Sequence, residues 1–252
     1  VSHERAVASL QRMRQLLESV SSPQELDAAI RREFEVYQSV GYDDRGTVFF
    51  TGYYCPIFEG RKQYDATFRF PLYRKPPDLV VDSEGITQGR RTPDGGIVPY
   101  YTRREIEEGG VLSGLEIAWL KDPFEAYVAT VQGSTKLRLA DGSLYELGYG
   151  GNNGHEYQSV ARKMVADGVL KRSEISLQAM LRYFRENPRD VWKFTWHNPR
   201  YVFFQERAGG PFGSLNVPVT PYYSIATDKL VFPRACMAFL TTELPDPQTR
   251  QI

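Results

Sequence analysis

Hydrophobic residues near the start of the chain recur at intervals of three and four positions. Ala6, Leu10, Met13, Leu17 and Val20 follow this spacing. Because an α-helix repeats every 3.6 residues, such positions share one face. The pattern therefore predicts a first amphipathic helix, which we interpret as a packing element.

A second helix is predicted to begin at Ser22. Its hydroxyl can accept a hydrogen bond from the backbone of Glu25, the Glu25 carboxylate can reach back, and Pro23 sits where a missing N–H is harmless. This arrangement is typical of a capped helix start. The expected buried stripe consists of Leu26, Ile30, Phe34 and Tyr37.

The centre of the chain mixes short strands and short helices. β-Branched and aromatic residues at 47–54 predict a strand whose end brings Thr51, Gly52 and Tyr53 to a surface. Prolines and glycines between 61 and 101 predict short strands and loops. A hairpin is expected around Ala140-Asp141-Gly142. Further helices are expected from Thr102, from Asp122-Pro123, over 155–167 and over 176–186.

From residue 201 onward the helical period disappears and strands are predicted at 201–205, 217–219, 225–226 and 236–240. Neither this tail nor the 47–54 strand completes a sheet alone, so the two are expected to pair. Residues 1–54 and 200–252 then form one discontinuous domain, and 55–199 form an inserted, β-rich, glycan-binding domain. The predicted fold class is mainly β with helices (α+β).

Composition narrows the classes of function. The 31 basic residues equal the 31 acidic residues, so no net charge gathers nucleic acid. The three histidines lack metal-ligand spacing, and two cysteines, Cys55 and Cys236, fit neither a disulfide scaffold nor a zinc cluster. Whether they pair is left open. Apolar runs are strand-sized and no signal peptide is visible; a start at Val1 predicts a processed or excised piece.

Three strings share one composition of aromatic, amide, hydroxyl and glycine residues: 49–54, 131–134 and 149–157. Aromatic faces stack on sugar rings, amides and hydroxyls bond sugar hydroxyls, and glycine permits close approach. The strings therefore predict a groove for a glycan. The alternative is that they contain turn glycines and half-buried sheet tyrosines, an interpretation that suits any one string taken alone.

With these strings, the chain resembles the membrane-bound lytic murein transglycosylase A (MltA) family, whose members cut the glycan strands of bacterial peptidoglycan. Order and spacing are kept over roughly 47–244. The matching motifs are Phe50-Thr51-Gly52-Tyr53-Tyr54, Pro71-Leu72-Tyr73-Arg74-Lys75-Pro76-Pro77, Val131-Gln132-Gly133-Ser134, Tyr149-Gly150-Gly151-Asn152-Asn153-Gly154-His155, Asn198-Pro199-Arg200-Tyr201-Val202-Phe203-Phe204 and Ser224-Ile225-Ala226-Thr227-Asp228.

The resemblance implies a double-psi β-barrel interrupted by a second, β-rich domain, with glycan bound in the groove between them. It also implies a monomer that acts on peptidoglycan without a metal or cofactor. The expected location is the cell envelope, on the periplasmic side of the outer membrane, and a lipid anchor outside this sequence fits the same expectation.

The implied reaction needs a single acid. It protonates the bond between N-acetylmuramic acid and N-acetylglucosamine, then takes the proton of the muramoyl C6 hydroxyl, which closes on C1 as a 1,6-anhydro sugar. Such an acid needs a raised pKa. The family carries it on a C-terminal Asp followed by Gly-Gly, which is absent before Ile252. We therefore expect an incomplete barrel and a catalytic residue beyond Ile252, with Asp228 as the candidate within this chain.

Glycan contacts are predicted for eleven residues, and several of them have a structural alternative. Tyr53 could pack in the barrel, 132–134 could form a turn, Asn153 could cap a helix, and Asp228 could hold a turn. The predicted contacts are Thr51, Gly52, Tyr53, Gln132, Gly133, Ser134, Asn153, His155, Ser224, Thr227 and Asp228.

Two other functions remain open at this stage. A non-catalytic peptidoglycan- or polysaccharide-binding protein would fit the missing acid, and a hydrolase of another polysaccharide would fit the same fold. Their products separate them: anhydro ends indicate a transglycosylase, reducing ends a hydrolase, and no products a binding protein.

Overall fold

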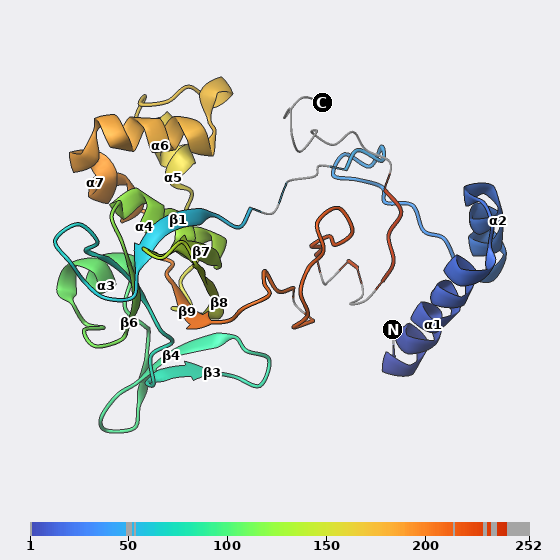
Figure 1. Cartoon of the computed structure of the whole chain (residues 1–252), viewed down its shortest axis with the longest axis horizontal. Coiled ribbons are helices and arrows are strands. Elements are labelled where there is room, and N and C mark those ends of the chain that lie inside the picture. The colour runs from blue at the N-terminus through green and yellow to red at the C-terminus, as the bar shows by residue number, and fades with distance from the viewer. Residues whose placement is uncertain are drawn as a thin grey trace. The chain divides into compact units, whose positions relative to one another are not determined.

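The chain divides into two compact units, Val1–Gly52 with Gly213–Ile252, and Tyr53–Phe212. The computed structural model in Figure 1 describes residues 2–48, 52, 54–213, 215–228, 231–232 and 236–240. Each unit is considered by itself.

Two helices, α1 (His3–Ser19) and α2 (Pro23–Glu33), begin the first unit. Ser22 accepts from Glu25 N at 3.2 Å, which confirms the predicted cap, although the Glu25 carboxylate accepts from Ser21 N rather than Ser22 N. The buried side chains include Met13 and Ile30. Leu17 and Tyr37 are 60% and 85% exposed, so the predicted stripes are only partly correct. α2 ends at Glu33, and Tyr37 lies beyond it.

The C-terminal strand predictions are largely wrong. Within 215–228 and 236–240, the described residues form no strand, so 217–219, 225–226 and 236–240 are corrected to turns and irregular chain. A strand needs a neighbour for its backbone N–H and C=O groups, which local composition does not provide. Half of the predicted 47–54 strand lies outside the described residues; Thr47 pairs through an isolated bridge with Gly41.

A six-stranded sheet forms the core of the second unit. Its spatial order is β2-β6-β1-β7-β8-β9; β1 and β7 are parallel and the other neighbours antiparallel. The edge strands of this order are β2 and β9. An isolated bridge between Arg74, directly after β2, and Phe204 in β9 brings these two edges together, so the sheet is curved. The strands are β1 (Ile57–Arg61), β2 (Phe70–Tyr73), β6 (Glu116–Leu120), β7 (Thr135–Arg138), β8 (Leu144–Asn152) and β9 (Val202–Glu206).

A smaller antiparallel sheet contains β3 (Leu79–Val81), β4 (Thr87–Arg91) and β5 (Ile97–Val98). Helices α4, α6 and α7 group together at one side of the large sheet (Figure 1). The helical elements of this unit are α3 (Arg103–Gly109), α4 (Pro123–Gln132), α5 (Val160–Ala166), α6 (Leu177–Glu186), α7 (Val191–Thr195) and the 3-10 turns η1 (Arg172–Glu174) and η2 (Pro188–Asp190).

Several of the predicted helix starts are confirmed. Thr102 and Glu105 form a reciprocal capping box at α3, and Asp122 accepts from Phe124 N and Glu125 N at α4. The helix predicted from His155 instead begins after Ser159, whose hydroxyl accepts from Arg162 N at 3.2 Å. Asn153 and His155 therefore lie in the loop between β8 and α5, and their predicted place at a helix start is wrong.

The strand predicted at 201–205 exists as β9, but it pairs with β8 and not with the 47–54 segment. The second unit thus extends to Phe212 and includes residues that the sequence grouped with the C-terminal tail. The fold is mixed α+β, as predicted. The described strands form no closed barrel, and the double-psi barrel and its inserted domain stay predictions of the resemblance.

The second unit is held by three apolar clusters, one inside the large sheet, one among α4 to α7, and one between the two sheets. α4 contacts two of them: Ala129 faces the sheet, while Phe124 and Val128 face the helices. This double packing fixes the C-terminal end of α4. No helix among the described residues has the length and apolarity required to cross a membrane.

Candidate functional site

The turn at Gln132-Gly133-Ser134 ends α4. Gly133 adopts a left-handed conformation (φ 76°), which favours glycine, and its N–H donates to Ala129 O at 2.9 Å. Gly133 and Ser134 are buried, and the Ser134 hydroxyl lies 3.7 Å from the sulfur of Cys55. Both cysteines are free thiols. Of the three predicted contacts in this turn, only Gln132 is partly exposed.

Tyr149, near the end of β8, lies directly beside this turn. A Cβ atom on Gly133 would stand 3.7 Å from the Tyr149 ring, which is 49% exposed. The Tyr149 hydroxyl accepts from Asn152 Nδ2 at 2.6 Å, and Asn152 Oδ1 accepts from Gly154 N at 2.8 Å. The amide of Asn152 therefore holds an exposed aromatic ring in place next to the end of α4.

A bulge in β8 explains two of the glycines in the 149–157 string. The register with β9 shifts between Tyr149 and Gly151. A Cβ on Gly150 would lie 2.8 Å from the carbonyl carbon of Phe204, and Gly151 has φ 142°. These glycines serve the packing of two strands, and the bulge turns Tyr149 outward.

Asn153 is buried, and every polar atom of its side chain is used by the fold. Its Nδ2 donates to Tyr101 O at 2.9 Å and Pro199 O at 2.8 Å, while its Oδ1 accepts from Tyr201 N at 2.8 Å. His155 Nε2 lies 2.8 Å from Tyr100 O. These contacts favour the structural interpretation of both residues over glycan contact.

Arg103 lies at the centre of a buried polar network under the same loop. It is fully buried, and its guanidinium donates to Glu107 at 2.9 Å, to Thr130 Oγ1 at 2.9 Å and to the carbonyls of Asn198 and Arg200. Trp196 Nε1 also donates to Glu107 at 2.9 Å. Burial raises the pKa of Glu107, and the neighbouring Arg103 opposes that shift.

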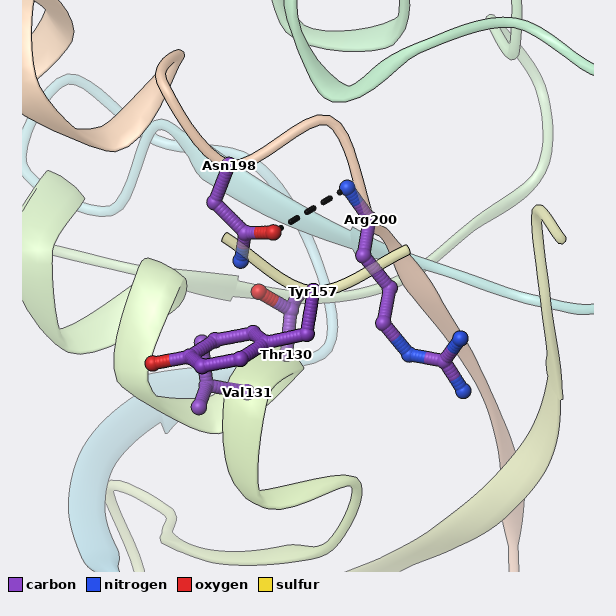
Figure 2. A pocket seen from close by; sticks show the side chains of 5 residues that line it. All are labelled: Thr130, Val131, Tyr157, Asn198 and Arg200. Carbon is purple, nitrogen blue, oxygen red and sulfur yellow. Dashed lines mark hydrogen bonds between the residues drawn. The ribbon is translucent and has the colours of Figure 1, made fainter. Parts of the chain in front are cut away.

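Above this network the surface opens into a pocket of about 420 Å³. Figure 2 shows the Tyr157 ring extending to one side and the Arg200 side chain to the other. Thr130 and Asn198 are buried in its wall, and Tyr157 is 53% exposed. Asn198 Oδ1 accepts from Arg200 N at 3.2 Å and Gln158 N at 3.1 Å. The lining residues are Thr130, Val131, Tyr157, Asn198 and Arg200.

Of the remaining predicted contacts, Thr51, Gly52, Ser224, Thr227 and Asp228 belong to the other unit, and Tyr53 begins the 53–212 unit. Gly52 is exposed with no atom within 4 Å of a Cβ built on it, and Ser224, Thr227 and Asp228 are exposed. Ser224 Oγ accepts from Thr220 N at 2.9 Å. Thr51 and Tyr53 lie outside the described residues.

The family model described as "MltA specific insert domain" matches residues 49–205. The chain belongs to the MltA family. The matched span contains β1 to β8, β9 except for its last residue, the turn at Gly133, the 149–157 string and Arg200. Both the network around Arg103 and the pocket beside it are therefore parts of the MltA-specific domain.

The curated relatives that this chain matches are longer than the chain itself. The membrane-bound lytic murein transglycosylase A of Escherichia coli is 30% identical over 213 residues, which cover 82% of this chain and 53% of that protein. The chain thus spans about half the length of the curated relatives it matches.

Two solved structures share the fold of this MltA chain. The crystal structure of E. coli MltA with bound chitohexaose matches with a TM-score of 0.72 and 26% identity, over 93% of this chain and 66% of that chain. A membrane-bound lytic murein transglycosylase from Agrobacterium tumefaciens matches with a TM-score of 0.62 and 30% identity, over 68% and 50%.

Sequence reasoning missed Tyr149, Tyr157 and Arg200. Both tyrosines stand in the 149–157 string, from which only Asn153 and His155 were selected. Exposed aromatic residues in a glycine-rich string were the available signal. Arg200 stands in the matching motif at 198–204, but the sequence does not show which residues surround its side chain, because they come from α4 and the 153–159 loop.

Proposed function

We propose that this chain supplies the glycan-binding part of a peptidoglycan lytic transglycosylase of the cell envelope. The observation that carries the proposal is the match to the MltA-specific insert domain over 49–205. Relatives at 30% identity are named membrane-bound lytic murein transglycosylase A, and one MltA structure holds chitohexaose, a chain of sugars. A periplasmic location, a lipid anchor and a monomeric state belong to the same proposal.

The geometry supports glycan binding at the end of α4. Tyr149 offers an exposed ring, Asn152 fixes that ring, and the partly exposed Gln132 directly precedes Gly133, which lies beside the ring. A ring face can stack on the apolar face of a sugar, and an amide can bond its hydroxyl or acetamido groups. Thr51, Gly52, Tyr53, Ser224 and Thr227 stay predicted glycan contacts of the resemblance.

The reaction requires one carboxylic acid that gives a proton to the glycosidic oxygen and then accepts one from the muramoyl C6 hydroxyl. Two carboxyl groups in the 53–212 unit have raised pKa values, but neither fits. Glu107 is bound to Arg103 and Trp196. Burial and the charge of Asp122 raise the pKa of Glu125. Glu125 lies eight residues before Gly133 on α4, about 12 Å along the helix axis.

These placements favour a division of labour in which this unit holds the glycan and the acid lies elsewhere. Asp228, exposed in the other unit, stays the candidate within the chain. A binding protein without catalysis is the second candidate function, and the engagement of Glu107 by Arg103 and Trp196 is the observation that favours it.

The test is incubation of the chain with purified insoluble peptidoglycan, followed by mass spectrometry of the soluble products and by co-sedimentation. We expect the chain to sediment with peptidoglycan, and Tyr149→Ala to sediment less. Tyr64→Ala is the matched control, because Tyr64 is 62% exposed in the same unit and lies outside the site.

Each outcome decides between the functions. Anhydro-muropeptides that disappear in Asp228→Asn would establish a transglycosylase with its acid in this chain. Reducing ends would indicate a hydrolase, and sedimentation without products would indicate binding alone. A chain that neither sediments nor releases products would refute the proposed function.

A further inference from the structure

Arg200 is a half-buried cation without a carboxylate partner among the described residues. Its guanidinium donates to His155 O at 3.0 Å, and none of the ion pairs in the described part of the chain includes it. A guanidinium carries five N–H donors. Arg200 therefore presents unused donors and an uncompensated positive charge at the pocket of Figure 2.

The rest of the pocket suits a substituent of a sugar. Tyr157 contributes a ring that is 53% exposed, and Val131 contributes an apolar wall. Val131 directly precedes Gln132, so the pocket continues from the proposed glycan contact along the last turn of α4. The opposite wall is fixed, because Asn198 is fully buried and holds Arg200 N and Gln158 N.

We propose that the Arg200 pocket is a subsite for a carboxylate carried by the muramoyl residues of the glycan. A guanidinium and a carboxylate match in charge and can form two parallel hydrogen bonds. The subsite rests on the proposed function and deepens it. It selects glycans that contain muramic acid over uncharged N-acetylglucosamine polymers. The carboxylate belongs either to the lactyl ether of a peptide-free strand or to the stem peptide.

The test compares three soluble ligands on the whole chain by isothermal titration calorimetry. Chitohexaose has no carboxylate, a peptide-free muramoyl oligosaccharide carries lactyl carboxylates, and the same oligosaccharide with stem peptides carries peptide carboxylates. Arg200→Gln removes the charge, whereas its backbone bonds to Asn198 and Arg103 do not depend on the side chain. Arg189→Gln, at an exposed position outside the pocket, is the matched control.

We expect Arg200→Gln to weaken binding of a carboxylate-bearing ligand about tenfold, the size of one charge-assisted hydrogen bond. Chitohexaose binding should change less than about twofold, because no charged group is lost from that complex. Arg200→Lys should retain part of the affinity, and added salt should weaken the wild type more than Arg200→Gln.

The pattern across ligands identifies the source of the carboxylate. Weakening for both muramoyl ligands indicates the lactyl group, and weakening for the peptide-bearing ligand alone indicates the stem. Equal weakening for all three ligands, or none for the muramoyl ligands, would overturn the subsite and leave the proposed function standing. Failure of the wild type to bind any of the three would overturn both proposals.

Discussion

Arg103 and Arg200 are neighbours in the structure, but their side chains have opposite environments. Arg103 is fully buried, and its guanidinium bonds Glu107, Thr130 and two backbone carbonyls. Arg200, whose carbonyl is one of those acceptors, is half-exposed, and its guanidinium bonds a single carbonyl. The guanidinium of Arg103 is used for structural hydrogen bonds, whereas that of Arg200 is available to a ligand.

The adjacent residues Asn152 and Asn153 show the same contrast between a structural and an available side chain. Asn153 is 2% exposed and joins three segments of backbone, while Asn152 is half-exposed and holds the ring of Tyr149. A buried polar network must be satisfied within the protein, because an unpaired buried group costs free energy. The residues that can recognise a ligand are therefore those that the network leaves at its edge.

Replacing Arg103 by methionine should cause the largest loss of unfolding free energy. The variant leaves the Glu107 carboxylate buried without its partner, and breaking a buried ion pair in this way costs about 3–5 kcal/mol. Urea unfolding followed by tryptophan fluorescence measures it, because Trp119, Trp192 and Trp196 all lie in the 53–212 unit. Arg189→Gln should unfold like the wild type. An unchanged midpoint for Arg103→Met would contradict a structural role for the network.

Asn153→Ala should cause the second-largest loss of unfolding free energy. Pro199 O keeps a bond from Arg103 N, but Tyr101 O and Tyr201 N lose their side-chain partner. One buried and one partly buried group without partners imply a loss of about 2 kcal/mol in unfolding free energy. The same fluorescence measurement applies, and a loss confined to glycan binding would instead assign Asn153 to the ligand.

The pH dependence of stability sharpens the role of Glu107. Burial raises its pKa in the folded state, so the folded protein binds this proton more tightly than the unfolded chain does. The contribution of Glu107 to stability is then fully present below the unfolded pKa of about 4.5 and falls as pH rises through the folded pKa. Glu107→Gln should remove this slope in urea unfolding from pH 4 to pH 8; an identical slope in both proteins would be contrary evidence.

Asn152→Ala should have the smallest effect on stability, within about 0.5 kcal/mol, since its side chain lies at the surface. Loss of its bond to the Tyr149 hydroxyl frees the ring, so chitohexaose binding should weaken by about threefold, the value of one modest hydrogen bond. Titration calorimetry measures the change. Full affinity would show that the ring orientation does not matter.

The sequence predicted what depends on neighbouring residues along the chain. Caps at Ser22, Thr102 and Asp122 and the hairpin at Ala140-Asp141-Gly142 were found because each signal lies within a few residues. The pairing of β9 with β8 was missed because it joins residues about fifty positions apart and leaves no local trace. The same reason explains the strands wrongly predicted in the C-terminal tail.

The site followed the same rule. The 149–157 string signalled a ligand surface, but only the fold distinguishes the two asparagines: Asn152 bonds the exposed Tyr149, whereas Asn153 is buried against backbone groups. Arg200 gained its significance from α4 and from a loop some forty residues earlier. Burial, and not residue type, separated the structural residues from the candidate contacts.

The central claim is that glycan lies along the end of α4 and the end of β8. Hydrogen–deuterium exchange with and without peptide-free muramoyl glycan tests it most directly. The account predicts slower exchange at 130–133 and 149–157, with no change over α6. Sedimentation with peptidoglycan that is accompanied by unchanged exchange in both segments would place the glycan elsewhere and contradict the account.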